Sequence, residues 1–328
     1  MHTGNHYKLS EFLVWTRRDI YVLIILAAIP TALHQLLDLY WVAMPWVPVA
    51  LIGTASAFLA GFKNTQSYNR LWEARQIWGS IVNSSRSWGI MVKDFVHADK
   101  TIHEQLIYRH CAWLTALRFQ LRKPQSWENQ NKPYNKEYHK YFSVPEWDSK
   151  LEDELKKYLS EGDYNYVLSK KNRATQLINL QSQHLRRLRA SGQIESFEYV
   201  EMERRLADLY DQQGRCERIK NFPYPRQFAS INLFFIWIFV ITLPFGMVNE
   251  FQKLGEHFAW LTIPFSVIVS WVFTCIEKVG EATENPFEGS ANDIPMAALC
   301  RTIEIDLRDM LDETELPAPL TPVNNILM

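Results

Sequence analysis

The chain has 328 residues, of which 47% are hydrophobic and 22% are charged, and its formal net charge is −1. A charge this close to zero gives no reason to expect a nucleic-acid partner. The four cysteines have no short spacing, so neither a zinc site nor a disulfide framework is indicated.

The first apolar run, Ile20–Leu37, has 18 residues and no acidic or basic side chain except His34. It predicts a membrane helix, because a proline such as Pro30 is tolerated there when neighbouring groups satisfy the freed carbonyl. Residues 1–19 are polar and do not resemble a cleavable signal peptide. We expect them to form a cytosolic N-terminal segment.

The second apolar run extends from Leu39 to Phe62 and has 24 uncharged residues, more than the roughly 20 that cross a bilayer core. No proline follows directly after Lys63. The sequence therefore predicts one helix that leaves the membrane and continues into water. Its crossing, Trp41–Phe62, forms a hairpin with the first, so residues 20–62 hold two membrane helices.

Within this second helix, Thr54, Phe58 and Phe62 share one face, because they are four residues apart. Small residues between them allow close helix packing in lipid. Such a helix can line a narrow pore in an oligomer. The alternative is that the two phenylalanines face lipid or a neighbouring helix.

Residues 63–226 form a long polar block with apolar residues at helical spacing, which we expect to be a cytosolic helical domain. We expect a loop over Lys123–Trp147, which contains three prolines. Helices are predicted over Asp148–Leu159, Asn165–Arg189 and Ser196–Ile219.

Two further uncharged runs, Gln227–Asn249 and His257–Ile276, predict membrane helices 3 and 4 within residues 227–276. Pro286 should end the last of these helices near Asn285. Residues 277–328 are expected to form a cytosolic C-terminal helix and tail. The predicted fold class is an all-α membrane protein with four transmembrane helices and a long helical cytosolic bundle.

Basic residues lie beside the membrane helices on one side, whereas the two hairpin links carry only Lys253. By the positive-inside rule, both termini and the polar block are cytoplasmic, and we expect a multi-pass membrane protein. Four crossings are too few to surround a wide pathway, so a pore would need several subunits.

No motif for enzyme chemistry is present: the chain has no Gly-rich phosphate loop, no His-x-x-x-His and no Cys-x-x-Cys. His97, His103 and His110 have spacings that do not fit a helical metal pair. We therefore expect no catalytic residue, no metal and no cofactor, and the protein is not predicted to be an enzyme.

Three stretches resemble the bestrophin family in its bacterial branch. They are Gly61-Phe62-Lys63-Asn64 through Tyr68-Asn69-Arg70, Gln213-Gly214-Arg215-Cys216-Glu217-Arg218-Ile219 with Pro223 and Pro225, and Glu284-Asn285-Pro286-Phe287 with Asn292-Asp293. The resemblance implies a homopentamer with one axial pore that conducts monovalent ions passively. The expected partners are other copies of the chain, monovalent ions and membrane lipids, with no nucleic acid.

The resemblance also implies site residues. The hydrophobic row of the pore neck maps onto Thr54, Phe58 and Phe62, although the family usually has an apolar residue at the position of Thr54. A second, cytosolic constriction falls near the start of the Ser196 helix, where Glu198 is the candidate. Of the calcium clasp of animal members, only Asn285 and Asp293 keep suitable ligands, because Ser290 and Ala291 replace acids. We therefore expect a non-functional clasp remnant at Asn285 and Asp293, through which calcium does not gate the protein.

The sequence thus predicts a bestrophin-like ion channel with a hydrophobic gate, selective for either anions such as chloride or cations such as sodium. The uncharged neck does not decide, and Glu195, Glu198 and Glu201 near the expected mouth favour cations. One alternative is a membrane-anchored scaffold or sensor that acts through its cytosolic helices. A secondary transporter would show inverted repeats and midplane charges, and neither is present.

Overall fold

The computed structural model describes residues 1–328 and is all-helical, as predicted. Its only β-type pairings are two isolated bridges near the chain ends. The chain divides into two compact units. One comprises residues 4–70 and 223–284 and is called here the membrane unit; the other comprises residues 1–3, 71–222 and 285–328 and is called the polar unit.

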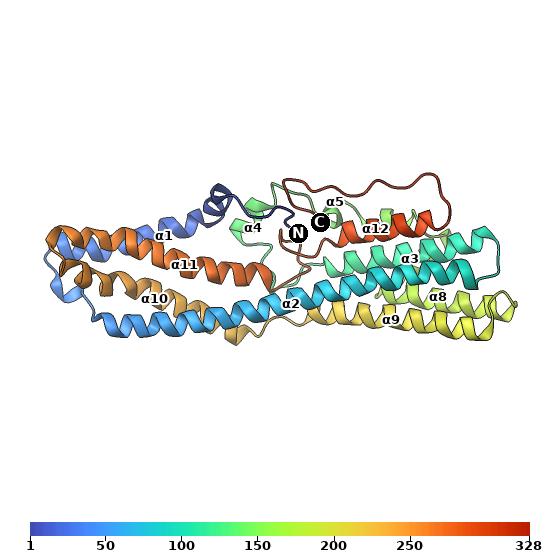
Figure 1. Cartoon of the computed structure of the whole chain (residues 1–328), viewed down its shortest axis with the longest axis horizontal. Coiled ribbons are helices and arrows are strands. Elements are labelled where there is room, and N and C mark those ends of the chain that lie inside the picture. The colour runs from blue at the N-terminus through green and yellow to red at the C-terminus, as the bar shows by residue number, and fades with distance from the viewer. The chain divides into compact units, whose positions relative to one another are not determined.

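Four helices of the chain are long and apolar enough to cross a membrane, which confirms the predicted number. In the membrane unit these are α1 (Leu9–Leu36), the first part of α2 (Trp46–Phe95), α10 (Arg226–Gln252) and α11 (Thr262–Thr283). They run side by side in Figure 1. Short 3-10 helices, Tyr40–Val42 and Glu256–Leu261, link them into two hairpins.

Helix α1 begins at Leu9, well before the uncharged run that starts at Ile20. The Glu11 carboxylate accepts a hydrogen bond from the backbone N–H of Lys8 at 3.3 Å and closes the first turn. Arg17 and Arg18 therefore lie inside the helix. Hydropathy marks only the apolar part of a helix, so the charged first turns are not apparent from it.

Helix α2 is one helix of 50 residues, which confirms that the second membrane helix continues into a polar segment. Its only proline, Pro48, lies in the first turn, where the missing N–H costs no intrahelical hydrogen bond. Residues 46–70 of α2 belong to the membrane unit and its remaining residues to the polar unit.

The polar unit contains the rest of α2 with α3 (Lys100–Leu121), α8 (Arg173–Ala190), α9 (Ser196–Asn221) and α12 (Met296–Asp309). These helices lie alongside one another (Figure 1). Their shared core includes three completely buried tryptophans, Trp78, Trp88 and Trp113. Four short helices connect α3 to α8: α4 (Pro133–Tyr138), α5 (Pro145–Asp148), α6 (Leu151–Leu155) and α7 (Glu161–Leu168).

The prediction of one helix over Asn165–Arg189 is wrong, because α7 ends at Leu168 and α8 begins at Arg173. The side chain of Asn172 accepts a hydrogen bond from the N–H of Thr175 at 3.0 Å and caps the start of α8. Apolar residues keep their helical spacing on both sides of the break, so periodicity alone joins the two helices.

The other predicted helix boundaries differ less from those in the structure. The Lys123–Trp147 loop contains α4 and the start of α5, and each of these begins with a proline, which is preorganised for the first helical position. The helix predicted over Asp148–Leu159 is limited to α6. Helix α9 matches its prediction closely, and α11 ends at Thr283, just before Asn285-Pro286 as expected.

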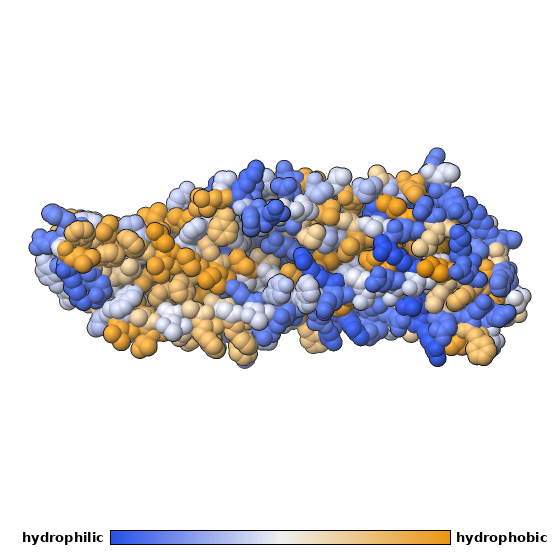
Figure 2. All heavy atoms as spheres, in the orientation of Figure 1, coloured by the Kyte–Doolittle hydropathy of each residue, from blue (hydrophilic) through white to orange (hydrophobic).

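Hydrophobic side chains gather on the visible surface of the four membrane helices, whereas the visible surface of the polar unit is mostly hydrophilic (Figure 2). Large apolar side chains such as Tyr21, Phe234 and Ile268 are exposed on α1, α10 and α11. An apolar surface this extensive is expected where lipid covers a protein.

Candidate functional site

Within the membrane unit, α2 carries two different rows of side chains. Thr54, Phe58 and Phe62 are exposed, the two phenylalanines by 76% and 45%. A second row is buried and recurs every three or four residues: Val49, Gly53, Ser56, Ala60, Lys63 and Ser67. One face of α2 therefore packs within its own chain, and the face that bears the aromatic rings is left open.

Small residues bring α2 close to α10. Gly53 of α2 lies against the ring of Phe239, and Gly246 of α10 lies against Val49. Helices in lipid gain stability from such close packing, because the hydrophobic effect does not drive their association there. Gly53 and Gly246 thus hold α2 close against α10 of its own chain.

The hydroxyl of Thr54 is engaged within its own helix. Its hydroxyl donates a hydrogen bond to the carbonyl of Ala50 at 2.9 Å, one turn earlier on the same helix. The proton of the hydroxyl is therefore already used. The row formed by Thr54, Phe58 and Phe62 consequently has no free hydrogen-bond donor. At its far end, the Phe62 ring lies 6.2 Å from the ring of Phe228 on α10.

Glu198 lies in the first turn of α9. Its carboxylate accepts a hydrogen bond from the backbone N–H of Glu195 at 3.0 Å and forms a capping box. The adjacent Phe197 is 89% exposed, the most of any large hydrophobic side chain in this structure. The sequence analysis did not select Phe197. The only signal for it is an aromatic residue at the start of a highly charged helix.

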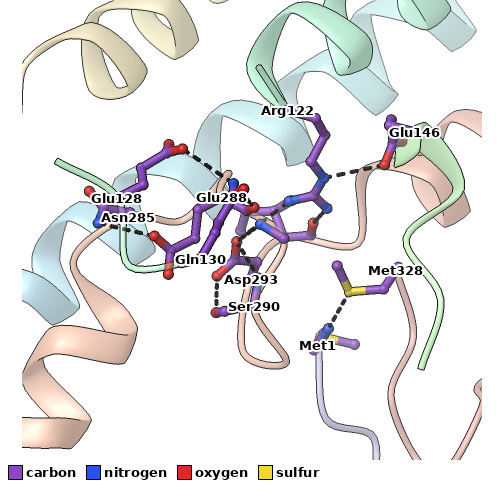
Figure 3. A network of polar contacts seen from close by, with 12 residues as sticks. Met1, Arg122, Glu128, Gln130, Glu146, Asn285, Glu288, Ser290, Asp293 and Met328 are labelled. Atoms are coloured by element: carbon purple, nitrogen blue, oxygen red, sulfur yellow. Dashed lines mark hydrogen bonds and ion pairs between the residues drawn. The ribbon is translucent and has the colours of Figure 1, made fainter. Parts of the chain in front are cut away.

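Asp293 is buried in the loop between α11 and α12, and its carboxylate is saturated by donors of the chain itself (Figure 3). Its Oδ2 atom accepts hydrogen bonds from the N–H groups of Gly289 at 2.7 Å and Ser290 at 3.1 Å. Its Oδ1 atom accepts one from the Ser290 hydroxyl at 2.5 Å. Burial raises the pKa of Asp293, and Arg122 acts against this increase.

Arg122, at the end of α3, is the cation of this network. Its side chain is almost completely buried and lies 3.4 Å from Asp293 Oδ2 and 3.3 Å from Glu146 Oε2. It also donates to the carbonyl of Ile294 at 3.2 Å. Sequence reasoning missed Arg122, because nothing local separates it from the other arginines of the chain.

Asn285 lies in the same loop, but its side chain points to another partner (Figure 3). Its amide donates a hydrogen bond to Glu288 Oε2 at 3.2 Å, and the N–H of Asn129 donates to the same atom at 3.0 Å. Burial raises the pKa of the Glu288 carboxyl, and Asp293 raises it further. Asn285 and Asp293, the two expected remnants of a clasp, thus have different partners.

Comparison with known proteins gives consistent matches over most of the chain. The sequence model of one family, described as bacterial/fungal bestrophin protein, matches residues 13–309. The voltage-dependent anion channel-forming protein YneE of Escherichia coli K12 is 30% identical over 280 residues, which cover 84% of this chain and 80% of that protein. A similarly described protein of Ralstonia nicotianae, RSc3414, is 27% identical over 274 residues, covering 82% and 78%.

Solved structures share the fold. The crystal structure of a bacterial bestrophin homologue from Klebsiella pneumoniae has a TM-score of 0.77 and 24% sequence identity to this chain. The match covers 90% of this chain and 98% of the other.

Proposed function

Because the chain belongs to the bacterial and fungal bestrophin family, and is thus an ion channel and not an enzyme, we propose that it forms a homopentamer around one axial pore. Monovalent ions pass through this pore passively. The observation that carries the proposal is the open face of α2, on which Thr54, Phe58 and Phe62 follow one another at one-turn intervals.

Around a symmetry axis, this face would form stacked rings of side chains. Two of the rings are aromatic, and the third has its hydroxyl proton bonded to Ala50. The two aromatic rings offer no polar group that could replace an ion's hydration shell, so this stretch can block conduction by dewetting. Thr54, Phe58 and Phe62 are therefore proposed as the hydrophobic gate.

The proposed topology follows the charge bias of the sequence. Residues 1–19, 63–226 and 277–328 are placed in the cytosol, and residues 20–62 and 227–276 in the inner membrane of a bacterium. Support comes from the basic residues that flank the four membrane helices on one side. Labelling single cysteines from the outside, in a chain without its native cysteines, tests this placement. Labels on the linker around Lys253, and none at either terminus, are expected.

A second constriction is proposed at the first turn of α9. Glu198 was selected from the sequence, but its carboxylate already caps the helix, whereas the neighbouring Phe197 is exposed. The structure favours Phe197 as the narrowing side chain and Glu198 as the residue that fixes the turn. Phe197→Ala should raise the unitary conductance more than Glu198→Gln does, and the reverse order would contradict this assignment.

The loop of Asn285 and Asp293 is proposed to be a clasp remnant that does not sense calcium. Calcium prefers six to eight oxygen ligands. The Asp293 oxygens already accept hydrogen bonds from the chain and face the Arg122 guanidinium. The Arg122 guanidinium thus lies beside the Asp293 carboxylate, which a bound calcium ion would need as a ligand.

The conducted ion is proposed to be monovalent. Two observations support opposite signs of its charge. The relatives in Escherichia coli and Ralstonia nicotianae carry the name of anion channels. Acidic side chains near the start of α9 favour cations, but Glu201 there is paired with Arg204 at 2.5 Å. Reversal potentials in a potassium chloride gradient, measured with the purified protein in planar bilayers, decide between the two signs.

Ion flux from liposomes that contain only the purified protein tests the function itself. A channel releases the trapped salt, whereas a membrane-anchored scaffold or sensor does not. Mass measurement of the detergent-solubilised particle tests the assembly. Several copies are expected, because four membrane helices are too few to surround a wide pathway, and the resemblance to bestrophins implies five. A monomer or dimer in several mild detergents would refute the pore on the symmetry axis.

A further inference from the structure

A carboxylate whose side chain is only 12% exposed joins three of the four membrane helices. Lys63 of α2, which directly follows Phe62, is only 3% exposed, and its Nζ atom lies 2.5 Å from Glu277 Oε1 on α11. The other oxygen, Glu277 Oε2, accepts a hydrogen bond from the side-chain amide of Asn232 on α10. One side chain of α11 therefore holds both α2 and α10.

The next residue of α11 makes a separate ion pair. Lys278 Nζ lies 2.6 Å from Asp19 Oδ2 on α1 and donates to the carbonyl of Trp15 at 3.1 Å. Adjacent residues of α11 thus connect it to the other three membrane helices, and each buried charge has a partner of opposite sign. Only the Glu277 contact involves α2.

The position of Lys63 constrains the direction of the aromatic row. Successive residues of an α-helix lie about 100° apart around its axis. Because the Lys63 side chain is held inside the unit, the Phe62 side chain points about 100° to one side of it, where Phe62 is 45% exposed and Lys63 is 3% exposed. Asn64 adds a second contact on this turn by donating to the carbonyl of Ile276 at 3.1 Å.

Buried ionisable groups are costly unless each is paired with a group of opposite charge. Apolar packing, such as that of Gly53 against Phe239, leaves a helix some freedom to rotate about its axis. An ion pair with a fixed partner restricts that freedom, since rotation of α2 would leave the Lys63 ammonium buried without its counter-charge.

We propose that Glu277 is a positioning residue for the gate: by binding Lys63 and Asn232, it fixes the rotation of α2 and so keeps Phe62 directed at the pore axis. This inference rests on the proposed function, in which Phe58 and Phe62 form the gate. Releasing Lys63 should let α2 rotate, open the aromatic rings and wet the neck.

The test is single-channel recording of the full-length protein with Glu277→Gln, which retains an acceptor for Asn232 but loses the charge. We expect a several-fold higher open probability than in the wild type. Asp19→Asn is the matched control, because it removes the other ion pair of α11 and leaves α2 untouched. It should lower the thermal stability of the assembly and leave the open probability within twofold of the wild type.

Two further variants keep the test decisive. If Glu277→Gln does not assemble, because Lys63 is left buried and unpaired, the double variant Lys63→Met/Glu277→Gln removes both charges and should show the same rise. In a Phe58→Ala/Phe62→Ala background, Glu277→Gln should add nothing, because it acts through these rings.

Three results would overturn the proposal. The first is an open probability that does not change in any assembled variant. The second is an equal rise of the open probability in Asp19→Asn. The third is a full further rise when Glu277→Gln is added to the Phe58→Ala/Phe62→Ala background. Failure of the channel function itself is distinguishable, because the wild-type protein would then pass no ions at all.

Discussion

Gly53 of α2 lies so close to the ring of Phe239 on α10 that a Cβ atom at position 53 would stand 2.6 Å from Cε2 of that ring. Only a glycine fits this approach without displacing the ring. The contact holds the buried face of α2 close against α10 of its own chain.

Replacing Gly53 by leucine should push α2 away from α10 and cost about 1–3 kcal/mol, as overpacking usually does. The measurement is the melting temperature of the purified assembly in detergent. Gly61→Ala is the control on the same helix, since a Cβ atom there meets nothing within 4 Å in the chain. Equal losses in both variants would show that the Gly53 contact is not special, and would place Gly61 at a contact between subunits.

Replacing both Phe58 and Phe62 by alanine should raise the open probability, because it widens and wets the proposed constriction. Selectivity should change little, since the neck carries no charge. The loss of stability should be well below the roughly 3–5 kcal/mol that removal of each buried phenylalanine costs, because these rings are 76% and 45% exposed in the subunit. Single-channel recording and thermal unfolding of the same sample provide both measurements.

A double variant that assembles poorly and conducts no more than the wild type would place Phe58 and Phe62 in a packing contact between subunits.

Currents in micromolar calcium and in excess chelator should match, because the oxygens of Asp293 are already engaged by Ser290, Gly289 and Arg122. Paired recordings from one bilayer are sufficient to measure this. Asp293→Asn should lower the stability of the polar unit, since it removes one of the two carboxylates paired with the buried Arg122 guanidinium, without creating any response to calcium. A reversible several-fold calcium effect in the wild type that is lost in Asp293→Asn would refute the expectation.

Acid should destabilise the polar unit through His110. Burial lowers the pKa of His110 from its ordinary value of 6.5 to about 3, and its Nε2 atom lies 2.9 Å from the hydroxyl of Ser85. Between these two pH values the folded state binds fewer protons than the unfolded state, so stability falls as the pH drops below about 6.5. At pH 5 the loss from this residue amounts to about 2 kcal/mol.

The measurement compares unfolding of the wild type and His110→Gln from pH 7 to pH 5. The variant keeps a side chain that can bond Ser85 but does not titrate, so its pH dependence should be flatter. His184, with a pKa lowered to about 4 mainly by burial, contributes in the same direction in both proteins. Identical pH profiles would mean that His110 is not protonated on unfolding in this range.

The sequence by itself determined the features that depend on neighbouring residues. Long uncharged runs predicted the four membrane helices, because a bilayer core demands a continuous apolar segment. The four-residue spacing of Thr54, Phe58 and Phe62 placed them on one face, because helical geometry is fixed. Pro286 predicted the end of α11 in the same local way.

Only the tertiary structure decided which partners the buried charges have. Lys63 and Glu277 are 214 residues apart in the chain, and Arg122 and Asp293 are 171 apart. No local pattern predicts these pairs, because the pairing depends on how distant helices meet. The break between α7 and α8 was also not predicted, because a capping side chain marks it and the helical spacing of apolar residues continues on both sides. Lys63, beside Phe62, is buried and paired with Glu277. This pair is the contact that we propose to fix which face of α2 stays open.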